Sequence, residues 1–334
     1  MMTILTRFAT RTAVATVIAA AMTFPAIAAE VSLKIAGQHP VDHYGTTALK
    51  QIEKELEAAG VGLSVKLFPA GQLGNGEEVF GDVARGVIDI GHTFVYSHND
   101  PKLEINSIPY LVSNYDQMEK VFSPGSVFYT TFEELLDNQD IKLLGIFVEG
   151  FIGVATANEP ANATTTGAKG LNIRVWSAEA ARSAAITMGF NTTTMGWGDV
   201  VPAITQGTVD GLIGGTAESY YTIMQDAIKY YIPYNAFVEN TAYYMSKKTW
   251  GELDEPQRAA IVSAFQSASQ ASFSKTEELD TFYTAKLIEA GITVVAISDA
   301  ERAAIASAVQ AETWPLLEEN LGKDLLDALK ADLN

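Results

Sequence analysis

The sequence contains no cysteine, which excludes disulfide bonds, thiol nucleophiles, thiolate zinc sites and iron–sulfur clusters together. Basic residues are also few: 22 Lys and Arg stand against 40 Asp and Glu, giving a formal net charge of −18 at pH 7. A surface of that sign repels phosphate backbones and anionic lipid headgroups. Nucleic acid is therefore not an expected partner.

Long apolar runs are absent after the N-terminal region. No segment in that part of the chain reaches the ~18 consecutive apolar residues of a membrane-spanning helix. At the N-terminus, Arg7 and Arg11 precede an apolar run, TAVATVIAAAMTF, and small residues follow at Ala26 and Ala28. This order is typical of a secretory signal peptide, so we expect residues 1–28 to be cleaved and the mature chain to reach the periplasm. An N-terminal membrane anchor is the alternative, but the run is short for a bilayer.

The sequence also lacks the common catalytic motifs, since GxGxxG, P-loop, HExxH and GxSxG patterns do not occur. His39 and His43 flank Pro40, which prevents a helical metal-binding pair, and His92 and His98 add little to a metal site. We expect loop or surface histidines and no metal. With no Ser–His–Asp pattern, nucleophilic catalysis has no support, and among 40 acids a hydrolytic carboxylate pair has no specific signal. We therefore expect a protein that is not an enzyme and needs no cofactor.

The pattern that is present alternates between strands and helices, as in α/β proteins. A first series of expected elements occupies residues 31–36, 46–59, 61–68, 77–86 and 87–95. A second series occupies residues 141–148, 171–175, 178–189, 191–196, 197–207 and 208–215. This order predicts two α/β units, each with a largely parallel sheet, and a ligand site beyond the carboxyl ends of the strands.

The C-terminal part is expected to be helical. Asp254 can cap a helix that begins near Pro256 and extends towards Leu287, and a further helix should begin after Ser298. Pro315 is expected to interrupt this last helical region because proline lacks an amide hydrogen.

Arg174 is the most informative single residue, because it is a lone cation between Ile173 and Val175 at the end of an expected strand. A partly desolvated guanidinium needs an anion, and its planar fork matches a carboxylate. The residues alone support two readings equally, a salt bridge within the protein or a site for a ligand anion. Trp176 and Trp197 can likewise be core residues or apolar walls around a small ligand.

Five segments of the chain, in order, carry a family resemblance: GQLGNGEEVFGDVARGVIDIG, SIPYLVSNYDQMEKVF, GAKGLNIRVW, MGWGDVVPAITQGTVDG and ENTAYYMSKKTWGELDEPQRAAI. They resemble segments of the solute receptors of tripartite ATP-independent periplasmic (TRAP) transporters. The resemblance implies an α/β, two-lobe periplasmic binding-protein fold with a hinged cleft and long C-terminal helices. It also implies binding of a small organic acid and its delivery to TRAP membrane permease subunits.

The resemblance also implies lobe boundaries. The first lobe would contain residues 29–150 and about 240–280, and the second lobe would contain residues 151–239 and about 281–334. The chain would cross between the lobes near residues 150 and 240.

For the ligand site, the resemblance places the family's carboxylate-binding arginine at Arg174. The other contacts it implies are Gln38, His39, Phe94, Tyr96, Phe151, Trp176, Trp197, Gly214 and Gly215. Gly214 or Gly215 occupies a position that is often asparagine in the family, and Trp176 replaces a usual proline.

The second arginine of the sialic-acid type has no counterpart, since Gly153 lies at about that place in GFIGVATAN. A sugar acid held by two arginines is therefore not expected, and a smaller, flatter or more apolar acid fits better. A zwitterionic compatible solute or a sulfonate stays an alternative, because the two tryptophans could enclose a cationic group. A secreted hydrolase is the less favoured alternative.

Overall fold

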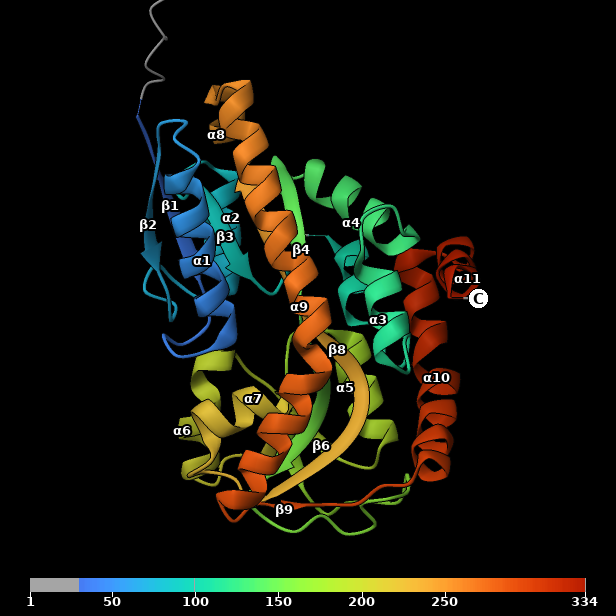
Figure 1. Cartoon of the computed structure of the whole chain (residues 1–334). Helices are drawn as coiled ribbons and strands as arrows, with labels where there is room; N and C mark the ends of the chain where they lie inside the picture. Colours follow the sequence, from blue (N-terminus) through green and yellow to red (C-terminus); the bar gives the residue numbers. More distant parts are fainter. Residues whose placement is uncertain (1–29, 99, 334) are drawn as a thin grey trace, which may run out of the picture.

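The computed structural model describes residues 30–98 and 100–333, so the expected signal peptide lies outside the described residues. Figure 1 shows an elongated α/β molecule. Its strands are β1 (Val31–Gly37), β2 (Leu63–Phe68), β3 (Ile90–Thr93), β4 (Ile141–Thr156), β5 (Asn172–Val175), β6 (Asn191–Thr194), β7 (Gly211–Gly215), β8 (Tyr230–Ser246) and β9 (Thr293–Val294).

Helices cover this sheet on both faces. The α-helices are α1 (Tyr44–Ala58), α2 (Gly76–Ala84), α3 (Tyr115–Phe122), α4 (Val127–Asp137), α5 (Glu179–Thr187), α6 (Val200–Thr205), α7 (Ala217–Ser219), α8 (Lys247–Glu252), α9 (Glu255–Glu289), α10 (Asp299–Leu321) and α11 (Lys323–Asp332). Shorter helical segments are η1 (Pro101–Ser107), η2 (Trp197–Asp199) and η3 (Tyr220–Met224).

A single sheet connects the two expected α/β units. Its strand order is β2-β1-β3-β8-β4-β7-β5-β6, with β9 beside β8. The outer strands pair in parallel, as predicted, but the two long central strands β4 and β8 are antiparallel to each other and to their neighbours β7 and β3. The prediction of two largely parallel units was therefore wrong at the centre, because the pairing of β4 with β8 joins segments far apart in the sequence.

The long central strands divide the molecule into two lobes. β3 pairs with β8 over residues 242–245, and β7 pairs with β4 over residues 153–156. We call the β1–β3 side the first lobe and the β5–β7 side the second lobe. Each has apolar clusters on both faces of the sheet, such as Leu33 with Leu49 in the first lobe and Ile173 with Ala184 in the second.

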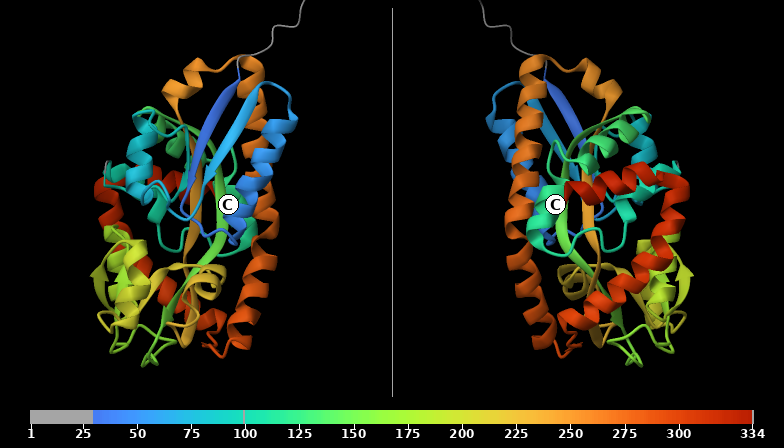
Figure 2. Two further views of the ribbon diagram at one scale, coloured as in Figure 1. Left: turned by 90° about the vertical axis from the view of Figure 1, so that its left-hand side faces the viewer. Right: turned by 90° about the vertical axis from the view of Figure 1, so that its right-hand side faces the viewer.

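Helix α9 runs beside both lobes, as Figures 1 and 2 show. Its N-terminus has the predicted cap: the Asp254 carboxylate accepts a hydrogen bond from the Gln257 amide at 2.9 Å, and the Gln257 side chain accepts one from the Asp254 amide at 3.1 Å. This reciprocal capping box satisfies two amides that the helix cannot.

Helix α10 continues through Pro315 to Leu321, so the predicted interruption was wrong. The neighbouring Trp314 is buried and donates a hydrogen bond from Nε1 to the Pro109 carbonyl oxygen at 2.9 Å. Packing of this kind on either side of the proline offsets the one lost helical hydrogen bond. The C-terminal end of α10 and helix α11 belong to one apolar cluster with residues of the first lobe, such as Val79 and Phe80. Residues 281–334 were expected in the second lobe.

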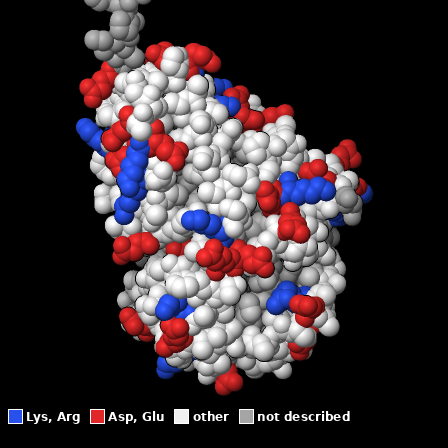
Figure 3. All heavy atoms as spheres, viewed as in Figure 1, with Lys and Arg blue, Asp and Glu red and all other residues white. Residues whose placement is uncertain are grey.

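Acidic side chains are spread over both lobes on the face in Figure 3, with fewer basic side chains among them. Within the described residues, no helix combines the length and the apolar content that crossing a bilayer requires.

Candidate functional site

Arg174 is buried at the end of β5, with only 2% of its surface exposed. Its Nε donates a hydrogen bond to the Met195 carbonyl oxygen at 3.0 Å, and its Nη1 donates to the Ile213 carbonyl oxygen at 3.4 Å. Among the described residues, no carboxylate lies within 4.0 Å of the guanidinium. Burial lowers the pKa of Arg174, because the charged form loses its water, but a guanidinium remains protonated at neutral pH.

Two tryptophans flank this guanidinium. The Trp197 ring lies 5.6 Å from the Arg174 Cζ atom, within range of a cation–π interaction. Trp176 follows Arg174 by two residues and reaches the other lobe, where its Nε1 donates a hydrogen bond to the Ser107 hydroxyl at 3.2 Å. Its ring also lies 6.4 Å from that of Phe94, so the two lobes meet at this side chain.

The backbone of Gly214 and Gly215 approaches these side chains closely. A Cβ atom at Gly214 would lie 2.8 Å from Arg174 Nη1 and 3.2 Å from the Trp176 ring, and the backbone there has a φ of +121°. A Cβ at Gly215 would lie 2.8 Å from Tyr220 and 3.3 Å from Trp197. There is thus no room for an asparagine at position 214 while Arg174 and Trp176 keep these places.

The first lobe contributes Gln38, Phe94 and Tyr96. The Gln38 side chain accepts a hydrogen bond from the Phe94 amide at 2.8 Å, and the Phe94 and Tyr96 rings lie 4.9 Å apart. Burial raises the pKa of Tyr96 to about 12, while the positive charge of Arg174 acts in the opposite direction. Tyr96 therefore lies within range of the Arg174 charge and Phe94 contacts Trp176, whereas Gln38 is connected to them through the Phe94 amide.

Phe151 and His39 are placed elsewhere. Phe151 packs against Tyr115, with ring centroids 5.3 Å apart, and its amide donates to an Asp280 carboxylate oxygen at 3.3 Å. His39 is adjacent to Gln38 in sequence, but its ring stacks on that of His43 with centroids 4.4 Å apart. The contacts described for Phe151 and His39 therefore do not include Arg174 or the tryptophans beside it.

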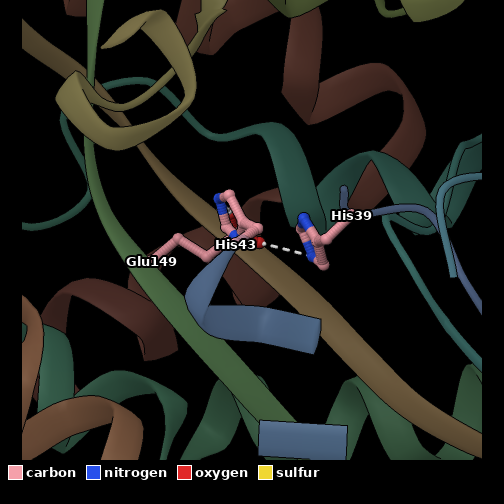
Figure 4. Close-up of side chains that lie close together, drawn as sticks. All are labelled: His39, His43 and Glu149. Atoms are coloured by element: carbon pink, nitrogen blue, oxygen red, sulfur yellow. Dashed lines mark ion pairs between the residues drawn. The ribbon is translucent and has the colours of Figure 1, made fainter. Parts of the chain in front are cut away.

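The histidines form a buried cluster with Glu149, shown in Figure 4. His39 Nε2 lies 3.2 Å from Glu149 Oε1, and His43 Nε2 lies 3.6 Å from Glu149 Oε2. His92 is also buried, on β3, with its ring 5.0 Å from that of His39, so the prediction of loop or surface histidines was wrong for His92. His39 and His43 do lie in a loop, between β1 and α1, but they are buried there. Pro40 does prevent a helix, but the His43 amide donates to the Pro40 carbonyl oxygen at 3.1 Å, and this turn brings His39 and His43 together.

The cluster has the residue types of a metal site, because ligand atoms from His39, His43 and Glu149 lie within 4.8 Å of one another. Its hydrogen bonding favours a different role. His43 Nδ1 accepts a hydrogen bond from the Gly45 amide at 3.1 Å, and burial lowers the pKa of His43 to about 3. The neutral ring therefore carries its proton on Nε2, which leaves no lone pair there for a metal.

Three glutamates in the gap between the lobes escaped the sequence analysis. Glu239 on β8 is half-buried, and its side chain has no hydrogen bond or ion pair among the described residues. Burial raises its pKa well above the usual range, while Arg174 acts in the opposite direction. Glu104 and Glu218 each accept a hydrogen bond from the other lobe. With 40 acids in the chain, no local pattern distinguishes these three.

The sequence matches the family model described as bacterial extracellular solute-binding protein, family 7, over residues 35–319. A solute-binding protein of Chromohalobacter salexigens is 23% identical over 289 residues, covering 84% of this chain and 82% of that protein. The ectoine/5-hydroxyectoine-binding periplasmic protein UehA of Ruegeria pomeroyi is 22% identical, covering 85% of each chain.

Solved structures share the fold. A TRAP periplasmic solute-binding protein from Polaromonas sp. JS666, bound to D-erythronate, superposes with a TM-score of 0.82 at 21% identity, covering 90% of this chain and 99% of that one. The two-lobe architecture is thus the one seen in that receptor.

Proposed function

This chain belongs to the family of bacterial extracellular solute-binding proteins, family 7, and from that premise we propose that it is a TRAP-type solute receptor. In this proposal it binds a small organic acid between its two lobes in the periplasm and delivers it to membrane permease subunits. It makes and breaks no covalent bond.

The proposal depends on the state of Arg174. A guanidinium has five N–H donors, and two hydrogen bonds, both to backbone carbonyl oxygens, are formed here. A buried cation without a nearby anion is costly. Because no carboxylate of the described protein lies within 4.0 Å, an anion from outside is the partner that best accounts for a buried arginine at this place.

The surroundings favour a small ligand. Trp176 and Trp197 are apolar walls on two sides of Arg174, and the space above Gly214 is already filled by Trp176. Glu239 supports a second candidate, a zwitterionic solute, because its carboxyl group has no side-chain hydrogen bond among the described residues and the charge of Arg174 favours its ionised form. A ligand cation there would complement Glu239 while the ligand carboxylate occupied Arg174.

A thermal-shift screen tests the proposal, since a ligand that binds only the folded protein stabilises it by RT ln(1 + [L]/Kd) and so raises Tm. D-erythronate, succinate, pyroglutamate, taurine and ectoine represent the candidate classes. We expect one of these classes to raise Tm and to bind with a Kd of about 1 μM or tighter by calorimetry. Mass spectrometry of the recovered ligand should find it unaltered, and turnover would favour a hydrolase instead.

The critical variant is Arg174→Ala, which should lose most of the affinity. Arg182→Ala is the matched control, because Arg182 is an exposed arginine of α5 paired with Glu179 and lies outside the Arg174 contacts. Unchanged affinity in Arg174→Ala, or equal losses in both variants, would refute the proposed site.

A further inference from the structure

Helix α5 of the second lobe receives its N-terminal cap from the first lobe. Its own N-cap residue, Ala178, has no side chain that could accept a hydrogen bond. The Ala180 amide instead donates to Glu104 Oε1 at 2.8 Å, and Glu104 belongs to η1 of the first lobe. The other carboxylate oxygen of Glu104 accepts from the Asn320 side chain at 2.8 Å, which fixes its orientation.

Helix α1 of the first lobe has the converse arrangement. His43 is its N-cap and satisfies the Gly45 amide, and the first turn contains no acidic residue. The Tyr44 amide donates to Glu218 Oε1 at 2.9 Å, and Glu218 belongs to α7 of the second lobe. The other oxygen of Glu218 lies 3.6 Å from His43 Nε2, the nitrogen that carries the proton.

We propose that Glu104 and Glu218 determine the affinity of this receptor without touching the ligand, by capping a helix of the opposite lobe only when the lobes are closed. The inference rests on the proposed function, since it assumes that ligand capture is accompanied by closure. Both contacts join residues of different lobes, and a separation of the lobes at these points would break them.

The physical chemistry of helix ends gives these contacts their strength. The first amides of a helix have no partner within it and carry the positive end of the helix dipole. A carboxylate that accepts from such an amide forms a charge-assisted hydrogen bond. Glu104 and Glu218 are 4% and 3% exposed, so water competes little for these contacts in this structure.

The position of the Glu104 contact supports a role in closure. An open groove of about 350 Å³ lies between the lobes, and Glu104 lines it together with Ser97 of the first lobe and Ser177 of the second. Trp176 donates to Ser107 in the same η1 segment, so the cap is adjacent to the wall of the proposed ligand site. Ligand binding and capping would therefore be coupled through η1.

The absence of cysteine makes the test direct, because two introduced cysteines can be spin-labelled without background. Val87 of the first lobe and Ile186 on α5 of the second are 53% and 47% exposed, which makes them suitable label sites. Pulsed electron–electron double resonance on the full mature chain then measures the distance between the two labels, and so between the lobes. It is recorded without ligand and with an equimolar mixture of D-erythronate, succinate, pyroglutamate and ectoine.

We expect Glu104→Ala and Glu218→Ala each to lower the ratio of closed to open molecules by about tenfold, the effect of losing one helix cap. Glutamine at either position keeps an oxygen for the amide and should retain most of the closed population. Glu179→Ala is the matched control, because it removes an exposed acid from the first turn of the same helix α5. Glu179 also lines the groove, but its ion pair is with Arg182 of its own helix and not with the other lobe.

The inference is overturned if both alanine variants keep the wild-type distance distribution while circular dichroism finds them folded. It is also overturned if the wild type has no closed population under either condition, because the caps then do not hold the lobes together. The proposed ligand site fails separately: in that case the mixture does not change the wild-type distribution, and Arg174→Ala behaves as wild type. The cap variants would still alter the ligand-free distribution.

Discussion

Gly214 lies directly beneath Arg174, and a single added carbon at this glycine would come within 2.8 Å of the Arg174 Nη1 atom. The close approach couples the two residues. The guanidinium can keep its place beside Trp197 only if residue 214 has no side chain. The carbonyl oxygen of the preceding residue, Ile213, accepts one of the guanidinium hydrogen bonds. The glycine is thus part of the arrangement that positions the cation.

Substitution of Gly214 by alanine should therefore weaken ligand binding by about tenfold or more, which corresponds to ~1.4 kcal/mol. The new methyl group displaces the guanidinium or the Trp176 ring. Calorimetry with the acid that gives the largest thermal shift measures the effect. Gly207→Ala is the control, since Gly207 also has a positive φ, +74°, but has open space around it. Equal losses of affinity in both variants would indicate backbone strain rather than displacement of Arg174.

Replacement of Arg174 by lysine separates charge from shape. Lysine keeps a positive charge but presents a compact ammonium instead of a planar fork, so it cannot form two parallel hydrogen bonds to a carboxylate. It also cannot reproduce both bonds to the Met195 and Ile213 carbonyl oxygens. We expect the Kd of Arg174→Lys to lie between those of wild type and Arg174→Ala. An affinity equal to wild type would mean that the fork is not used.

Local sequence patterns predicted the parts of this molecule that depend on neighbours along the chain. The Asp254 cap and the strand that carries Arg174 are of this kind. The interlobe caps are not, because Glu104 and Ala180 are 76 residues apart and Tyr44 and Glu218 are 174 residues apart. No local pattern marks an acid whose partner is an amide in a distant segment. The same reason explains why the antiparallel pairing of β4 with β8 was missed.

The stability of the protein should depend on pH through Glu218. Burial raises the pKa of Glu218 from 4.5 to about 7, so the folded state binds its proton more tightly than the unfolded chain does. Stability from this group is therefore greatest below pH 4.5 and is lost as the pH rises towards about 7, after which it is constant. The shift corresponds to a loss of about 3 kcal/mol at most.

Glu218→Gln isolates this contribution, since glutamine cannot titrate but keeps the oxygen that accepts from Tyr44. The groups that face Glu218 are His43, His39, Tyr44, Glu149, the hydroxyl of Tyr283 and Asp280, whose own pKa burial raises to about 7. His43 acts in the opposite direction, because its lowered pKa makes stability fall as the pH drops below 6.5. The measured quantity is therefore the difference in unfolding free energy between wild type and Glu218→Gln, from urea titrations between pH 4 and 8. A difference that does not vary with pH would contradict the assignment.

The two ring nitrogens of His43 have different surroundings. Nδ1 caps α1 by accepting from the Gly45 amide, and Nε2, which has no hydrogen-bond partner among the described residues, lies 3.6 Å from a carboxylate oxygen of Glu149 and of Glu218. Asparagine is a good N-cap residue, so His43→Asn should keep the cap and lose the ring nitrogen beside the carboxylates, whereas alanine loses both. We expect His43→Ala to be less stable than His43→Asn by about 1 kcal/mol in urea unfolding.

The same tautomer predicts the response to metals. If Nε2 carries the proton, Zn²⁺ can bind there only when the Gly45 hydrogen bond to Nδ1 is broken, because the ring proton must move to Nδ1. Zn²⁺ or EDTA should therefore leave Tm of the wild type unchanged. A rise in Tm with Zn²⁺ that disappears in His43→Asn would reverse this interpretation. In that case His39, His43 and Glu149, which lie close enough to share an ion, would form a structural metal site rather than a hydrogen-bonded cluster.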